Sequence, residues 1–206
     1  HPSIYHPAPQ PWGLPLRCMI SNNIKNLTFA GRNISVTHAA LSSSRVMATC
    51  SILGQALGTA VAQAVNNGCD IREIDVKTLQ NTLMDDDCFI PWHDRKVSLL
   101  TQNAVCSCET VRNGKYRGEE NCWHGKDGEQ IVYSFDDDTK ISEIRLVFDS
   151  NLNRNYHNMP CEYPLVQKQF KLPDTLIKEY RIEGVTKDGA VKTITVNNNH
   201  QRFVKH

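Results

Sequence analysis

Residues 30–62 read AGRNISVTHAALSSSRVMATCSILGQALGTAVA, and this stretch decides the fold of the first half of the chain. A Gly-Arg turn leads into a loop of small polar residues, and the loop leads into a long helix predicted over about residues 44–66. Ser42, Ser43 and Ser44 offer N-cap oxygens for this helix, and Gly68 is its predicted stop. Backbone N–H groups at a helix N-terminus hold oxygen-rich groups well, so the stretch predicts a binding pocket there.

Small residues keep the predicted helix thin along much of its length: Gly54, Ala56, Gly58, Ala60 and Ala62. Each glycine in a helix costs roughly 1 kcal/mol relative to alanine. The cost suggests that another part of the protein packs close to the backbone, and ordinary packing of a helix on a sheet explains it too. A second helix is predicted over residues 75–86, with Asp75 as its cap.

The second half of the chain changes to a period of two. Four stretches alternate polar and apolar residues as strands do: 130–135, 141–148, 180–185 and 191–196. Asp188-Gly189, between the last two stretches, is a hairpin-turn signal. Several short strands joined by turns predict an antiparallel β-sandwich. In the first half, a short strand is predicted at residues 26–30.

Composition narrows the classes of function. The chain has 206 residues and a formal net charge of +1, which gives no electrostatic case for binding nucleic acid. No apolar run approaches the length that spans a bilayer. The Pro-rich start, HPSIYHPAPQPWGLPL, lacks the order of a signal peptide. We expect it to be cut from a longer parent, and the sequence does not decide the cellular location.

Eight cysteines are spread over the chain: Cys18, Cys50, Cys69, Cys88, Cys106, Cys108, Cys122 and Cys161. A long chain of this cysteine density does not favour a disulfide scaffold. Cys106 and Cys108 would face the same side of a strand, where they are awkward to bridge to each other. No Cys-x-x-Cys appears, and no metal site is predicted. Mostly free thiols are expected, with one or two disulfides as the alternative.

Residues 30–58 resemble the C-terminal signature of a family of FAD-dependent oxidoreductases. The signature reads roughly Ala-Gly-Arg-Asn-Ile-Ser, then Thr-His, Arg-Val-Met-Ala-Thr-Cys and Gly-Gln-Ala, and those positions are here 30–35, 37–38, 45–50 and 54–56. Upstream, residues 14–20, LPLRCMI, are similar to the family's Ile-Pro-Tyr-Arg-Cys-Leu. Leu16 replaces the tyrosine, which implies a different substrate side of the flavin.

The resemblance implies residues that contact FAD along the ribityl chain and the edge of the flavin ring. They are Gly31, Arg32 and Asn33 on the ribityl side, and Ser44, Arg45, Val46 and Met47 on the ring side. Backbone N–H groups of the second set would face the O2 edge, where a helix N-terminus favours the negative charge of reduced flavin.

Two residues are candidates for a catalytic role. His38 would transfer a proton beside the flavin, since histidine titrates near neutral pH, or it is a loop histidine bonded to its neighbours. Arg45 would bind an anionic substrate or the flavin, or it is a surface arginine.

The chain departs from the family in lacking the Gly-x-Gly-x-x-Gly turn that holds the ADP half of FAD. We therefore expect FAD in the full-length parent and not in this chain alone, and whether this chain is itself an enzyme stays open. The parent would pass a hydride between a substrate carbon and flavin N5. The missing N-terminal domain, or a second copy of the chain, is the expected packing partner.

Residues 104–154 look like a discoidin-type, galactose-binding-like jelly roll, and residues 172–183 and 199–202 resemble a C-terminal appendage of the same family. The implied fold class is α+β. Residues 1–92 would be a helical remnant of a flavin-binding α/β domain, and residues 93–206 an antiparallel β-sandwich. A small, sugar-like hydroxylated molecule is the implied substrate. The alternative is a non-catalytic module that binds a glycan or a partner chain.

Two further patterns have two interpretations each. Trp92 and Trp123 stack on sugar rings or belong to the core. Asp136-Asp137-Asp138 offers oxygen ligands of the kind that calcium prefers, or it forms a solvated turn.

Overall fold

The structure is a computed structural model that describes residues 10–151 and 172–206. The chain divides into two compact units. The first comprises His1–Val97 with Gly114–Tyr116, and the second comprises Ser98–Asn113 with Arg117–His206. The domain boundary between residues 92 and 93 stays a prediction. Residues 152–154 of the jelly-roll resemblance and Cys161 lie outside the described residues.

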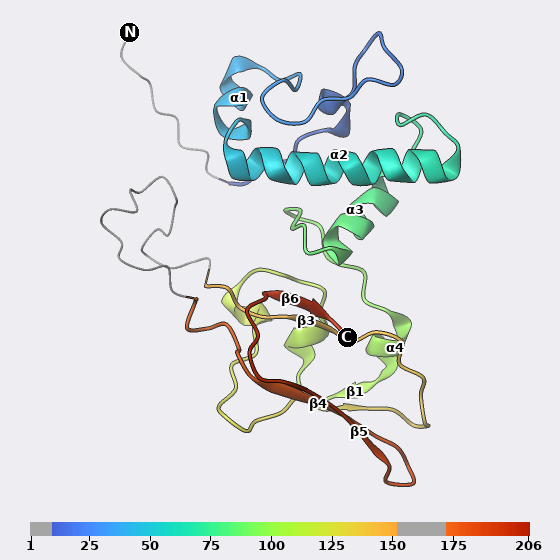
Figure 1. Ribbon diagram of the computed structural model, residues 1–206, viewed down its shortest axis with the longest axis vertical. Helices are drawn as coiled ribbons and strands as arrows, with labels where there is room; N and C mark the ends of the chain where they lie inside the picture. The colour runs from blue at the N-terminus through green and yellow to red at the C-terminus, as the bar shows by residue number, and fades with distance from the viewer. Residues whose placement is uncertain (1–9, 152–171) are drawn as a thin grey trace. The chain divides into compact units, whose positions relative to one another are not determined.

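The first unit is helical. It contains η1 (Leu16–Met19), α1 (His38–Ser44), α2 (Met47–Asn67) and α3 (Val76–Asp85). Figure 1 shows α2 as the long central helix, with α1 beside its N-terminal end and α3 against its side. The strand predicted at residues 26–30 is wrong, because this segment makes only a single bridge, between Thr28 and Ile20.

The single helix predicted over residues 44–66 is wrong at its start, because two helices occupy this region. α1 ends at Ser44 and α2 begins at Met47. The hydroxyls of the three serines in α1 donate back to carbonyl groups of the preceding turn, at 2.6, 3.3 and 3.0 Å. They therefore compete with the helix ladder instead of capping α2. Thr37 caps α1 by accepting the N–H of Ala40 at 3.3 Å.

One stripe of α2 supplies the centre of the core. Its buried residues are Leu53, Leu57, Ala60 and Ala64, which recur at helical spacing. They belong to one hydrophobic cluster with Leu79 and Leu83 of α3. The predicted stop of α2 at Gly68 is confirmed, because this residue has the left-handed φ of +62° that suits glycine.

The rest of the α2 surface is largely open. Met47 is 87% exposed and Val65 is 74% exposed. By length and composition alone α2 could cross a membrane, which the sequence prediction did not recognise, and 22% of its most apolar window is buried. A core helix of a soluble protein passes the same test, so length and composition do not establish a membrane span.

The second unit contains short helices and short strands. Its helices are α4 (Leu99–Asn103), η2 (Glu109–Arg112) and η3 (Glu119–Asn121). Its strands are β1 (Val105–Cys106), β2 (Tyr133–Ser134), β3 (Arg145–Val147), β4 (Tyr180–Val185), β5 (Val191–Val196) and β6 (Phe203–Lys205). The mixed α+β content of the prediction is therefore confirmed.

The described strands pair as three separate two-stranded antiparallel sheets, β1–β2, β3–β6 and β4–β5. The β4–β5 hairpin is confirmed at its predicted residues, and Gly189 turns it with a φ of +82°. The strands predicted at 130–135 and 141–148 are shorter than expected. A galactose-binding-like sandwich is not confirmed by these sheets and stays a prediction, as does the sugar-like substrate that rested on it.

Polar groups tie the loops of the second unit together. The buried Asn199 side chain donates to the carbonyl oxygens of Ile177 and Gln201, at 2.8 and 2.9 Å. Lys187, in the turn of the hairpin, donates from Nζ to Asp137 at 2.6 Å and from its backbone to Asp138 at 3.0 Å. The Asp run therefore contacts this turn.

The two tryptophans lie in different surroundings. Trp92 is 71% exposed and has a φ of +60°, so the core interpretation is wrong for it. Trp123 is half-buried, and its ring covers Gly125 so closely that a Cβ there would overlap it.

We expect Leu57→Ala to lower the free energy of unfolding by about 2–5 kcal/mol, because it removes buried methyl groups and leaves a cavity. Ile52→Ala is the matched control on the same helix, since Ile52 is 50% exposed, and it should cost less than about 1 kcal/mol. Urea unfolding measures both. Equal losses would contradict the assignment of the buried stripe.

The predicted cap of α3 is confirmed. The Asp75 carboxylate accepts the N–H groups of Lys77 and Thr78, at 3.2 and 3.1 Å. The Thr78 side chain, followed by these N–H groups, lowers the pKa of Asp75 in the folded chain.

A lowered pKa adds stability above the unfolded value and loses it as the pH falls through the folded value. We expect Asp75→Ala to destabilise the chain at neutral pH and Asp75→Asn to retain much of the cap. The difference in stability between the native chain and its Asp75→Asn variant should shrink below about pH 4, where the unfolded carboxyl protonates, and level off below the folded pKa. Thermal unfolding at several pH values tests this, and a constant difference would count against it.

Candidate functional site

The start of α2 lies beside the Gly-Arg turn. A side chain added at Gly31 would contact Sγ of Cys50, in the first turns of α2, at 3.8 Å. Two hydrogen bonds also hold this end of α2 against the end of α1. Thr49 Oγ1 donates to the Ser43 carbonyl at 3.5 Å, and Cys50 Sγ donates to the Ser44 carbonyl at 3.7 Å. The structure thus brings together the two parts of the quoted stretch that the sequence singled out.

No side chain caps α2, which starts from the apolar Val46. The other α-helices in the described ranges have side-chain caps. The first intrahelical bond of α2 runs from Cys50 N–H to the Val46 carbonyl at 2.9 Å, so the N–H groups of Met47, Ala48 and Thr49 have no intrahelical acceptor. These donors, at the positive end of the helix dipole, suit an anionic or oxygen-rich group.

Apolar surface adjoins these donors. Val46 is 52% exposed and Met47 is 87% exposed. A flat ring with polar edge atoms could bind here. The apolar side chains would contact its face, and the backbone N–H groups would donate to its edge.

The predicted contact residues are placed unevenly around this point. Ser44 is 2% exposed, and its hydroxyl donates to the Ala40 carbonyl at 3.0 Å. It is the last residue of α1, so its N–H belongs to the ladder of α1 and not to the first turn of α2. Arg32 and Asn33 are exposed in the turn that follows Gly31.

The two candidate catalytic residues are not brought together. His38 is the first residue of α1, and Arg45 directly follows its last residue. A helix rises 1.5 Å per residue, so their backbones lie roughly 10 Å apart. Both are exposed. Arg45 adjoins the start of α2, whereas His38 lies at the other end of α1.

A shallow groove of about 490 Å³ connects two stretches of the resemblance. It is lined by Trp12, Leu14, Pro15, Cys18, Ser35, Val36, Thr37 and Ala40. The residues from LPLRCMI form one side and those around the cap of α1 the other. Sequence reasoning did not single out Trp12 or Ser35 as site residues. Both stretches that line the groove resemble one family signature, and this resemblance was the signal that could have pointed to it.

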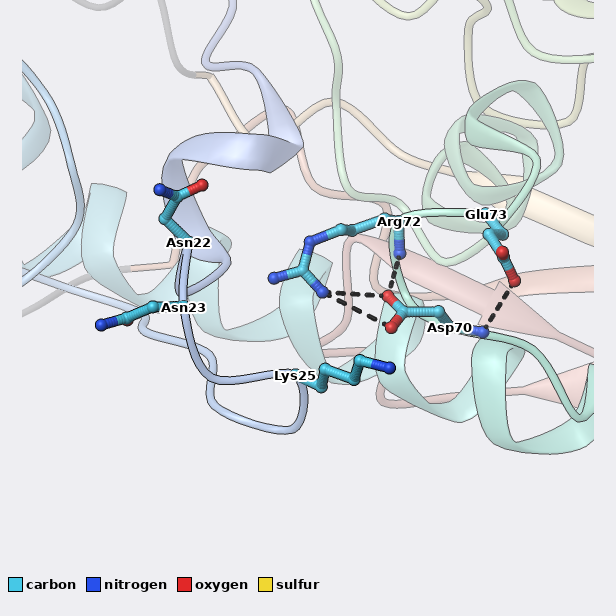
Figure 2. Close-up of a pocket in the computed structure, with 6 residues that line it drawn as sticks. All are labelled: Asn22, Asn23, Lys25, Asp70, Arg72 and Glu73. Atoms are coloured by element: carbon cyan, nitrogen blue, oxygen red, sulfur yellow. Dashed lines mark hydrogen bonds and ion pairs between the residues drawn. The ribbon is translucent and has the colours of Figure 1, made fainter.

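A polar pocket of about 380 Å³ lies elsewhere in the first unit, where the loop before residue 28 meets the segment after α2. Figure 2 shows its lining residues, Asn22, Asn23, Lys25, Asp70, Arg72 and Glu73. Arg72 bonds Asp70 at 3.1 Å and also donates to the Ser21 carbonyl. The backbone N–H of Arg72 is the first cause that lowers the pKa of Asp70. The charged groups of Arg72 and Asp70 pair with each other, and Arg72 also links the two loops through the Ser21 carbonyl.

Side chains that ligate metals are scattered over the part of the chain that the structure describes. In residues 10–151 and 172–206, no three or more His, Cys, Asp or Glu side chains gather as metal ligands do.

The start of α2 also lies in a segment that is similar to a known family. Residues 1–83 match the FAD dependent oxidoreductase family. The match covers 83 of the 206 residues and includes η1, α1, α2 and most of α3. No curated protein and no solved structure matches the chain. The first unit therefore contains a segment related to FAD dependent oxidoreductases, and the donors at the start of α2 lie within it.

Two glycines in this flavoprotein-related segment should respond oppositely to alanine. Gly31 has a φ of +103°, so Gly31→Ala should destabilise the chain by about 1–3 kcal/mol. Gly54 has a helical backbone, and among the described residues nothing lies within 4 Å of a Cβ built there. Gly54→Ala should therefore stabilise the chain by roughly 0.5–1 kcal/mol. Calorimetry measures both, and a destabilising Gly54→Ala would mean that α2 packs closely on this face.

Proposed function

We propose that this chain supplies the wall of a flavin site on the ribityl and ring side in a FAD-dependent oxidoreductase. The observation that carries the proposal is the uncapped start of α2 beside the Gly31 turn. The family match over residues 1–83 supports it, because it includes both elements.

The residues fit the ring half of FAD. N–H groups of Met47, Ala48 and Thr49 would donate to the O2 edge of the ring, and Val46 and Met47 would contact its face. Gly31 to Asn33 would lie along the ribityl chain. When bound, FAD supplies acceptance and donation of a hydride, and this chain's part is to orient the ring and to stabilise negative charge on its edge.

The two candidate catalytic residues differ in their support. Arg45 lies between α1 and Val46, the N-cap residue of α2, so its guanidinium could reach the same edge of the ring. His38 as a proton-transfer group depends on a substrate placed along α1, and the exposed N-terminal end of α1 leaves it accessible to such a molecule.

The open face of α2 is the proposed contact for the dinucleotide-binding part of the flavin domain. Gly54 and Gly58 face open space in the described structure, and Val61 and Val65 beside them are 39% and 74% exposed. The 21 residues of α2 include no Asp, Glu, Lys or Arg. A close-packing, uncharged surface of this kind suits another element of the same domain better than it suits water.

We expect Val46→Asp to stabilise α2 and to weaken flavin binding at once. An aspartate at this position caps the helix, adding about 1 kcal/mol, and its carboxylate takes the N–H groups that the flavin edge would use. Val65→Asp, at the far end of α2, should slightly destabilise the chain through the helix dipole and leave flavin binding unchanged. Thermal unfolding and titration of riboflavin fluorescence provide the two readouts.

Riboflavin, FMN and FAD should bind this chain equally and weakly, because the proposed wall contacts only the parts that they share. Much tighter binding of FAD than of riboflavin would show an ADP pocket in this chain and overturn the proposal. Equal riboflavin binding by the chain and by its Val46→Asp variant would remove the start of α2 from the site.

A further inference from the structure

Cys106 and Cys108 of the second unit are separated by a bend in the chain instead of sharing one strand. β1 includes Cys106 but ends there, and the chain bends at Ser107 before Cys108. The premise that Cys106 and Cys108 share a strand is therefore wrong, and both are free thiols in the structure.

The bend folds one thiol onto the backbone of the other residue. Cys106 Sγ accepts the N–H of Cys108 at 3.5 Å and donates to the Cys108 carbonyl at 3.2 Å. A sulfur in contact with both the nitrogen and the oxygen of Cys108 lies near its Cα. The Cys108 sulfur is attached to that Cα through one methylene, and its position depends on the χ1 rotamer.

The surroundings hold polar partners for both sulfurs. Cys108 Sγ lies 3.0 Å from Thr110 Oγ1. Cys106 is the cross-strand partner of Tyr133 and shares a side-chain hydrogen bond with it. The Arg112 guanidinium interacts electrostatically with Cys106 and is fixed by the Thr101 carbonyl at 2.8 Å. Arg112 and Tyr133 thus both interact with Cys106, and the backbone N–H of Cys108 donates to its sulfur.

We propose that Cys106 and Cys108 form a redox-active dithiol that closes to a disulfide by exchange with small-molecule disulfides. The Cys106 thiolate attacks one sulfur of the small disulfide, and the S–S bond breaks to release one thiolate. The Cys108 thiolate then attacks Cys106 in the mixed disulfide and releases the second. Two electrons pass from the cysteine pair to the small disulfide, and the two protons lost by the cysteines end on its two thiols.

Tyr133 reports the state of the pair. Burial, followed by the hydrogen bond to Cys106, raises the pKa of Tyr133 to about 12. Disulfide formation removes the ionisable Cys106 sulfur from this interaction, so the pKa of Tyr133 should fall part of the way toward its ordinary value of 10.0. The change is visible in the ultraviolet absorbance of tyrosinate.

The test uses the whole chain and oxidised glutathione. We expect the folded chain to lose two hydrogens in mass and two titratable thiols, with a peptide map joining Cys106 to Cys108. Cys108→Ser should retain one glutathionyl group on Cys106, and Cys106→Ser should lower the pKa of Tyr133 without any oxidant. Cys50→Ser, in the first unit, is the control that leaves both readouts unchanged.

Several results would overturn the proposal. They are two thiols that stay free, separate glutathionyl groups on both cysteines, or a disulfide from either cysteine to another part of the chain. The wild-type map decides among these even where a variant fails to fold. An unchanged Tyr133 titration on oxidation would refute the contact between Tyr133 and Cys106.

Discussion

The packing of one stripe of α2 against α3 is the contact on which the first unit depends. Leu53 and Leu57 of α2 meet Leu79 and Leu83 of α3 in one cluster. Fully burying each leucine contributes about 1.5–3 kcal/mol, which no polar contact of this unit approaches at an exposed site. Because this stripe fixes the axis and rotation of α2, it also fixes the direction in which the N–H groups of its first turn point.

The same packing explains why so much of α2 stays open. A helix with a single buried stripe presents its remaining surface outward, and in α2 that surface contains glycine, alanine and valine instead of charge. Natural surface helices carry charged residues on this side. Glycine there lowers stability with no gain from any contact in the described residues. Close approach of another element would offset this cost, and this is the physical reason for proposing the open face as a packing surface.

Sequence reasoning succeeded where the signal is local. The Asp75 carboxylate accepts from N–H groups that lie within three residues of it. Asp188-Gly189 sets the β4–β5 hairpin through the φ that glycine allows. Gly68 ended α2 for the same reason. It failed at the start of α2, since serines offer the same hydroxyl to a cap or to a preceding carbonyl, and only the surrounding turn decides between them.

Non-local features were harder to predict. β3 pairs with β6 across more than fifty residues, and alternation of residue types does not specify a partner. At the candidate site, the resemblance grouped Ser44 with Val46 and Met47 at one helix start, whereas the structure has Ser44 at the end of α1 and Met47 at the start of α2.

The second unit rests on a different balance from the first. Ala104 and Leu176 are its buried apolar residues within the described ranges, and Arg112 and Asn199 join its segments through backbone carbonyls. A sheet as short as β1–β2 is marginal by itself, so side chains at its end contribute a large share of its stability. Cys106 occupies one of its two paired positions. A change in the bonding of the Cys106 sulfur therefore affects one of the two residue pairs of this sheet. A change at a thiol buried in the helical core of the first unit would alter one packing contact among many.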